Sequence, residues 1–176
     1  MGAPPTESTE GTVVFTDIVG FTEYTALRGD TEAIALLAMQ ERFVLEALPP
    51  RARIVKELGD GLLIWFEDAC EALQTALVLQ QTFERASAET EVPLWVRMGI
   101  HSGRQTRWGN DLVGHDVNVA ARVVDVASPG EVLVSEATMH QIQDRLPDIV
   151  FEELGPVVMK GIPDAMRLYR ALPDLS

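Results

Sequence analysis

The chain alternates between short apolar runs and longer amphipathic stretches, and the order of these runs predicts a mixed fold. Residues 12–19 (TVVFTDIV) form a β-branched and aromatic run that is typical of a buried strand, and Gly20 separates it from a helical segment. A longer helical pattern covers residues 30–48 and stops before two prolines. Its apolar residues lie on two opposite faces, so the second face packs either within the fold or against another subunit.

The middle of the chain predicts a hairpin, a helix and a further strand. Residues 51–58 and 62–66 read as strands around Gly59-Asp60-Gly61, and Asp-Gly between apolar runs is a strong hairpin signal. A stripe of apolar and small residues after Asp68 predicts a helix that lies close to a sheet, and residues 94–102 predict the next strand. The order strand, helix, strand, strand, helix, strand is the ferredoxin-like βαββαβ arrangement.

The last third of the chain predicts an extension of this core. The expected segments are an irregular stretch at 103–114, a helix at 116–127, a strand at 131–134, a short helix after Ser135, and strands near 150–159 and 167–171. The fold class is therefore α+β, with a ferredoxin-like βαββαβ core and an additional C-terminal α/β extension. Residues 1–10 are rich in Pro, Thr and Glu and predict a disordered arm ahead of one domain at 11–176.

Composition narrows the function classes. The 176 residues include 14 Lys and Arg against 27 Asp and Glu, for a net charge of −13. This charge argues against nucleic acid as a partner and against an RNA-binding module on the same topology, because both need a basic surface. The sequence predicts no membrane segment, because no apolar run reaches the roughly 18 residues that a span needs. The single cysteine, Cys70, excludes an internal disulfide and suits the reducing cytoplasm.

Two acidic residues stand out against this background. Asp17 lies inside an apolar strand, where a carboxylate is costly unless it is paired or bound to a metal. In residues 18–22, which follow directly, the strand turns into a helix whose N-terminal N–H groups can bind phosphate. The alternative is that Asp17 only caps this helix. Asp60 alone reads as a turn residue. In the predicted fold, however, the first strand and the hairpin are neighbours, so both carboxylates can meet and bind Mg²⁺.

Five motifs, in order, resemble the class III nucleotidyl cyclase catalytic domain, over about residues 11–171. They are FTDIVGFT (Phe15–Thr22), KELGDG (Lys56–Gly61), RMGIHSG (Arg97–Gly103), DLVGHDVNVAARV (Asp111–Val123) and MKGIP (Met159–Pro163). This family converts a nucleoside triphosphate into its 3′,5′-cyclic monophosphate and pyrophosphate with two Mg²⁺ or Mn²⁺ ions per active site. The resemblance therefore implies an adenylyl cyclase that acts on ATP by two-metal-ion catalysis.

The resemblance also implies a role for each matching residue. Asp17 and Asp60 would bind the metals with the Ile18 carbonyl, Lys56 and Asp111 would read adenine, Asn118 would orient the ribose, Arg122 would stabilise the transition state, Lys160 would contact the terminal phosphates, and Val19, Gly20, Phe21 and Thr22 would form the phosphate cradle. Guanylyl cyclases usually carry Glu and Cys at the positions of Lys56 and Asp111, so this pair favours ATP over GTP.

In this family the metal-binding aspartates come from one subunit, and the residues that match Lys56, Asp111, Asn118 and Arg122 come from the other. The resemblance therefore implies a head-to-tail homodimer with two shared active sites. The stretch 103–111 is shorter than in mammalian members, where an arm grips the partner. This suggests a bacterial type with a shortened dimerisation arm, which upstream regulatory domains of a longer protein would assist. The alternatives are a guanylyl cyclase and a catalytically weak regulatory domain that only binds nucleotide. Such regulatory domains typically lose a metal aspartate or the arginine, whereas Asp17, Asp60 and Arg122 are all present.

Overall fold

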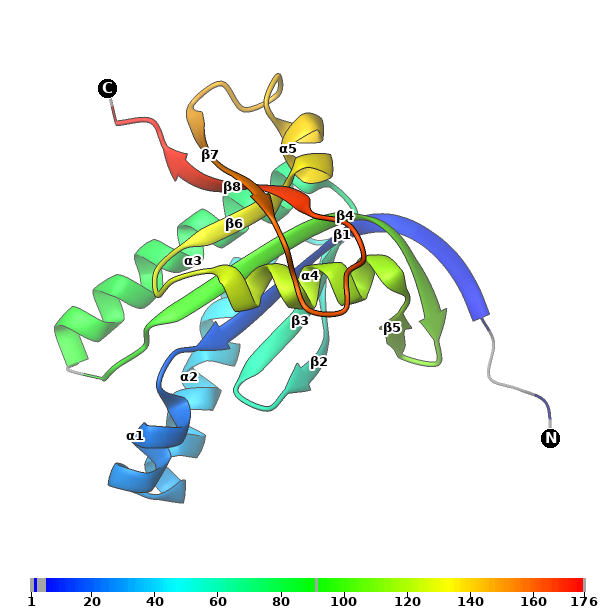
Figure 1. Cartoon of the computed structure of the whole chain (residues 1–176). Coiled ribbons are helices and arrows are strands. Elements are labelled where there is room, and N and C mark those ends of the chain that lie inside the picture. Colours follow the sequence, from blue (N-terminus) through cyan, green and yellow to red (C-terminus); the bar gives the residue numbers. More distant parts are fainter. Residues whose placement is uncertain (1, 3–5, 91, 176) are drawn as a thin grey trace.

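The β-branched runs of the sequence assemble into one mixed sheet with helices on both faces (Figure 1). The computed structural model describes residues 2, 6–90 and 92–175. Within these residues the elements are β1 (Thr6–Ile18), α1 (Phe21–Arg28), α2 (Asp30–Ala47), β2 (Arg53–Leu58), β3 (Gly61–Phe66), α3 (Ala69–Thr90), β4 (Val96–Trp108), β5 (Asp111–Val113), α4 (His115–Val126), β6 (Val132–Ser135), α5 (Glu136–Ile142), β7 (Ile149–Val157) and β8 (Met166–Pro173).

The strand order confirms the α+β class and the ferredoxin-like core. The sheet runs β2-β3-β1-β4-β6-β8-β7, and the first four strands are the antiparallel core that the βαββαβ order predicts. β6 joins β4 in parallel, and β8 and β7 continue the sheet as the predicted C-terminal extension. β5 pairs only with β4, outside this path.

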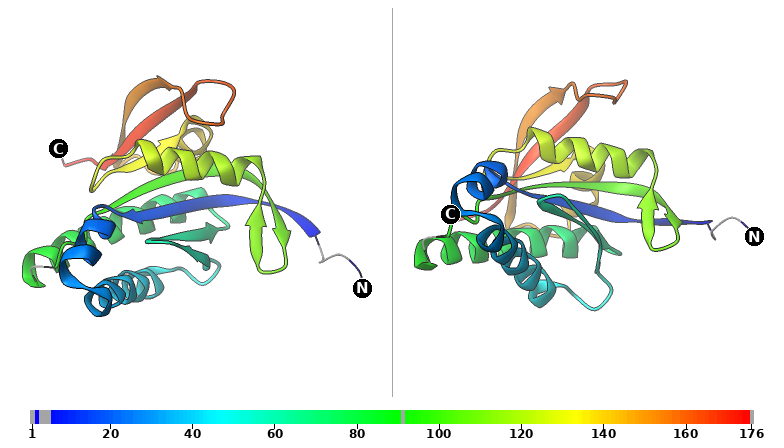
Figure 2. Two further views of the ribbon diagram at one scale, coloured as in Figure 1. Left: turned by 60° about the horizontal axis from the view of Figure 1, so that its bottom comes forward. Right: turned by 90° about the horizontal axis from the view of Figure 1, so that it is seen from below.

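Alternation along β1 directs its side chains to two separate cores. Val14 and Ile18 belong to the larger apolar cluster, which includes residues of α2, α3 and α5. Val13 and Phe15 belong to a second cluster with residues of α4 on the opposite face. The two turned views show α2 and α3 below the sheet and α4 above it (Figure 2). Because side chains alternate along a strand, Asp17 points to the same face as Phe15, toward α4.

The structure corrects two predictions about flexible segments. Residues 6–10 were expected in a disordered arm, but they extend β1 and pair with residues 104–108 of β4. Residues 103–114 were expected to be irregular, but β4 continues to Trp108 and forms a tight hairpin with β5. Gly109, in the turn between the two strands, has a positive φ of 63°. Residues 6–10 and 104–108 are strands because they pair with each other across about 100 residues, which local composition does not reveal. The β4–β5 hairpin is a local pairing around the turn at Gly109, which the sequence analysis missed. Residues 1 and 3–5 of the predicted arm lie outside the described residues.

α2 carries one packed face and one exposed face. Its buried residues are Ala33, Leu36, Gln40 and Val44, which lie three or four positions apart as an amphipathic helix requires. Ile34 and Leu45 are 64% and 56% exposed in this single chain. In the described part of the chain, no helix is long and apolar enough to cross a membrane.

Candidate active site

The structure brings Asp17 and Asp60 together at one end of the sheet. Asp17 is paired in register with Gly61, the first residue of β3, so the turn that carries Asp60 lies against the end of β1. A Cβ atom on Gly61 would lie 1.8 Å from the Thr16 carbonyl oxygen, so only glycine permits this approach. Burial, together with a hydrogen bond to Asp17 and the negative charge of Asp17, raises the pKa of Asp60 to about 6.

These two carboxylates fit a divalent cation. Acidic side chains that crowd each other disfavour double ionisation, and a bound cation removes that penalty. Mg²⁺ sites for phosphate chemistry use one or two carboxylates and leave the remaining positions to water and substrate oxygens. Asp17, Ile18 and Asp60 line the same pocket. The three residues that the resemblance names as metal ligands are therefore neighbours.

A small pocket of about 270 Å³ connects the carboxylates to the start of α1. Its lining includes the continuous run from Asp17 to Glu23, where β1 ends and α1 begins. Gly20 has φ 75°, a left-handed conformation that turns the chain sharply from strand to helix. Val19, Gly20, Phe21 and Thr22 thus lie beside the acidic pair, and the N-terminus of α1 can offer N–H groups to a phosphate there.

Arg97 is a site residue that the sequence analysis did not single out. It lies opposite Asp17 in the register of β1 with β4, and both its Nε and its Nη2 are 2.7 Å from Asp17 Oδ2. The pair is partly exposed, and Arg97 lines both the 270 Å³ pocket and a larger neighbouring one. The ion pair with Arg97 thus offsets the free-energy cost of placing the Asp17 carboxylate in an apolar strand, and Arg97 also faces the larger pocket.

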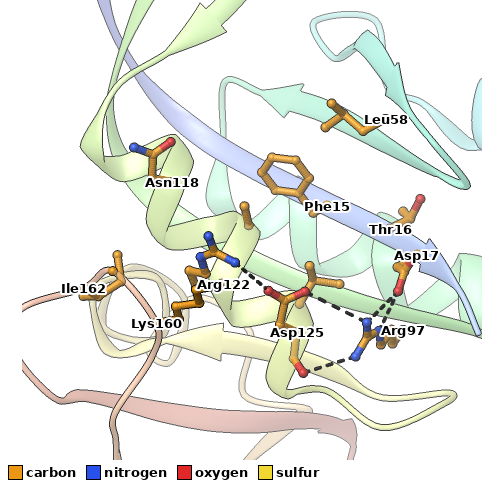
Figure 3. Close-up of a pocket in the computed structure, with 13 residues that line it drawn as sticks. Phe15, Thr16, Asp17, Leu58, Arg97, Asn118, Arg122, Asp125, Lys160 and Ile162 are labelled. Atoms are coloured by element: carbon orange, nitrogen blue, oxygen red, sulfur yellow. Dashed lines mark hydrogen bonds and ion pairs between the residues drawn. The ribbon is translucent and has the colours of Figure 1, made fainter.

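Charged groups continue from Arg97 toward α4, as Figure 3 shows. Arg97 Nη1 donates to the Asp125 carbonyl oxygen at 3.1 Å, and Arg122 Nη1 donates to Asp125 Oδ2 at 3.2 Å. Asp125 and Arg122 are about half exposed, and exposed ion pairs of this kind hold their partners only weakly. Arg122 can therefore exchange Asp125 for a more highly charged ligand.

A pocket of about 710 Å³ gathers three of the other predicted residues in front of Asp17. Asn118 and Arg122 reach it from α4, where a spacing of four places them on one helix face. Lys160 reaches it from the loop between β7 and β8. Anionic and cationic groups thus face each other across a space large enough for a nucleotide.

Lys56 and Asp111 form a separate pair. Lys56 on β2 donates to Asp111 on β5 at 2.9 Å, although 55 positions separate them in the sequence. About a third of each side chain is exposed, so the pair can still bind a ligand. Neither residue lines either pocket that contains Asp17. Within one chain, therefore, the residues expected to read a base are not assembled with the residues expected to bind metal.

His101 has a structural position on β4. Its Nδ1 lies 2.6 Å from Ser135 Oγ, and its Nε2 lies 3.0 Å from Asp116 Oδ1, in the first turn of α4. The imidazole is 4% exposed and lines neither pocket that contains Asp17. It ties the start of α4 to the sheet and so supports the helix that carries Asn118 and Arg122.

The position of His101 makes stability sensitive to acid. Burial lowers the pKa of His101 below its ordinary 6.5, with His115 acting in the same direction and Asp116 opposing. The folded state therefore prefers the neutral imidazole, and this contribution is lost as pH falls below about 6.5 because the unfolded chain takes up the proton first. We expect the change in melting temperature from about pH 7.5 to about pH 5 to be less favourable in the wild type than in His101→Gln, because the raised pKa of Asp60 contributes equally to both proteins and in the opposite direction. The same dependence of melting temperature on pH in the wild type and in His101→Gln would contradict this role of His101.

Comparisons with known proteins agree with this geometry. The sequence profile of the adenylate and guanylate cyclase catalytic domain matches residues 4–171. A pH-sensitive adenylate cyclase of Mycobacterium tuberculosis is 29% identical over 171 residues, which cover 96% of this chain and 42% of that protein. An adenylate cyclase of Streptomyces coelicolor is 34% identical over 131 residues, which cover 74% of this chain and 33% of that protein. The chain thus spans less than half the length of these relatives.

Solved structures show the same fold over nearly the whole chain. The adenylyl cyclase CyaB from P. aeruginosa superposes with a TM-score of 0.82 at 25% identity, covering 98% of this chain and all of that one. An adenylate/guanylate cyclase/hydrolase from Silicibacter pomeroyi gives a TM-score of 0.82 at 28% identity, covering 97% of this chain. The arrangement of strands and helices described above is therefore shared with both structures.

Proposed function

Because the chain belongs to the family of adenylate and guanylate cyclase catalytic domains, we propose that it converts ATP into 3′,5′-cyclic AMP and pyrophosphate in the cytoplasm. The supporting observation is the meeting of Asp17 and Asp60 beside the N-terminus of α1. Lys160 lines the adjacent pocket, and Arg122 is partly exposed on α4, where it can be presented to the acidic pair of a second copy of the chain. Metal-binding acids, a phosphate cradle and cations are the groups that phosphoryl transfer needs, and no protein nucleophile is required.

In the proposed reaction the 3′-oxygen of ATP attacks the α-phosphorus, the bond to the pyrophosphate oxygen breaks, and the hydroxyl proton leaves to solvent. Two Mg²⁺ or Mn²⁺ ions would acidify the hydroxyl and screen the triphosphate. Asp17 and Asp60 hold the positive charge in place, and the N–H groups at residues 19–22 bind phosphate oxygens. Arg122 meets the charge that grows on the α-phosphate, while Asn118 fixes the ribose so that the hydroxyl is aligned.

In this proposal Arg97 and Lys160 contact the triphosphate of ATP. Arg97 is held by Asp17 and Asp125 in the single chain. Arg97 lines both pockets that contain Asp17, so its guanidinium would be available to phosphate oxygens of a nucleotide bound there. Lys160 lines the larger of these pockets and would contact the terminal phosphates.

We propose that each site is shared between two copies of the chain. Lys56 and Asp111 are paired with each other but stand apart from the pockets of Asp17, so a second chain is needed to bring a base-reading pair to the metal residues. In this proposal Asp17 and Asp60 belong to one subunit of each site, and Lys56, Asp111, Asn118 and Arg122 belong to the other. A head-to-tail homodimer supplies both halves twice. The exposed apolar residues of α2, Ile34 and Leu45, are compatible with burial against a partner.

Product analysis tests the proposed reaction and its base preference together. Purified protein is incubated with ATP or GTP and Mn²⁺ or Mg²⁺, and the products are separated by chromatography. We expect cyclic AMP from ATP, little cyclic GMP, and no product after chelation with EDTA. Since Lys56 and Asp111 would donate to and accept from adenine, the double variant Lys56→Glu with Asp111→Cys should shift the preference toward GTP.

Two outcomes of this assay would overturn the proposal. Cyclic GMP as the main product would make the chain a guanylyl cyclase and remove the adenine role of Lys56 and Asp111. Nucleotide binding without turnover in any metal would favour the regulatory alternative, a domain that senses nucleotide without converting it.

A further inference from the structure

Gln40 is a buried polar residue on the packed face of α2. It is 1% exposed, and among the four buried residues of this helix it is the polar one. A buried amide is costly unless its oxygen and nitrogen both find partners. Gln40 finds both, and both partners belong to the segments that hold the acidic pair.

The contacts of Gln40 join three elements. Thr16 Oγ1 donates to Gln40 Oε1 at 2.7 Å, and the same hydroxyl accepts from the Leu62 backbone N–H at 3.0 Å. Gln40 Nε2 donates to the Asp60 carbonyl oxygen at 3.3 Å. Thr16 immediately precedes Asp17, and Leu62 lies two residues after Asp60, so the Gln40 side chain is bonded to both acid-bearing segments.

Apolar packing alone would not fix this geometry. Thr16 and Leu62 are also buried, so water does not replace a hydrogen bond that is lost there. Gly61 already places the turn in close contact with the Thr16 carbonyl, which limits how near the two segments come. The amide of Gln40 sets how the turn lies along that contact, because its two hydrogen bonds act in two directions.

From this geometry we propose that Gln40, with Thr16, is a positioning residue that sets the separation and orientation of Asp17 and Asp60 for divalent-cation binding. The proposal rests on the metal role given to these acids above. Residues that orient metal ligands without touching the metal typically change metal affinity or activity by about 10- to 100-fold when they are replaced. Since Gln40 belongs to α2, movement of that helix would also reach the acidic pair.

The test compares the Mn²⁺ dependence of four variants with that of the wild type. Gln40→Met removes both amide contacts at nearly constant volume, and Thr16→Val removes only the hydroxyl. The matched control is Thr12→Val, because Thr12 is buried on the same face of β1, four residues earlier, and bonds Ser102 at 2.8 Å. We expect the half-saturating Mn²⁺ concentration to rise about 10- to 100-fold in the first two variants and to stay unchanged in the control. Thr16→Ser, which keeps the hydroxyl, should restore it.

The Mn²⁺ dependence of each protein is measured in two ways. One is cyclase activity as a function of Mn²⁺ concentration, and the other is direct Mn²⁺ binding, followed by electron paramagnetic resonance of the free ion. The second readout needs no turnover, so the same ranking of variants in a chain that makes no cyclic nucleotide would keep this inference and reject the proposed function. Wild-type Mn²⁺ binding in folded Gln40→Met and Thr16→Val would overturn the inference, as would an equal loss in Thr12→Val. If Gln40→Met does not fold, Thr16→Val and Thr16→Ser decide the question.

Discussion

Replacing Arg122 with alanine should lower kcat with ATP by about a hundredfold to a thousandfold, or on the order of 3–4 kcal/mol of transition-state stabilisation. The reason is that Arg122 meets charge that develops on the α-phosphate, and little of this charge exists in bound ATP. KM for ATP should therefore change only a few-fold. Turning Arg122 toward the phosphate costs little free energy, because the side chain gives up only one partly exposed ion pair with Asp125.

Arg104→Ala is the control for the loss of a surface arginine. Arg104 is 70% exposed at its side chain and pairs with Glu10, and it lines neither pocket that contains Asp17. Its kcat should equal that of the wild type. A kcat for Arg122→Ala within about fivefold of wild type, in protein with an unchanged melting temperature, would remove Arg122 from the transition state.

Local pattern was sufficient for the elements that carry the acidic pair. The β-branched run of β1 and the Asp-Gly turn between β2 and β3 are short-range signals, and the structure contains both. Their adjacency followed from the element order, because the ferredoxin-like arrangement makes β1 and β3 neighbours. Asp17 and Asp60 could therefore be expected together from the sequence.

The polar partners of these acids could not be predicted in the same way. Arg97 faces Asp17 only because of the exact register of β1 against β4, and a shift by one residue would send it to the other face. Gln40 lies in an otherwise ordinary helical pattern, and its burial depends on where α2 packs on the sheet. Pairings across 80 and 24 positions are tertiary events, which residue periodicity does not encode.

Co-expression of Asp17→Ala and Arg122→Ala chains decides whether one site draws on two subunits. With two different affinity tags, tandem purification isolates the heterodimer. In a head-to-tail arrangement, one of its sites collects both defects, while the other combines an intact Asp17 from one chain with an intact Arg122 from its partner. The purified heterodimer should therefore have about half of the wild-type activity, although each variant alone is inactive.

A second heterodimer is the control for activity that arises from co-expression itself. Asp17→Ala combined with Asp60→Ala should stay inactive, because both defects fall on the metal half and each site of that heterodimer contains one of them. The structure makes the distinction sharp, since Asp17 and Arg122 of the same chain also line one pocket. If that intramolecular pocket were the complete site, every chain in the first heterodimer would lack one essential group, and no activity would return in isolated heterodimers.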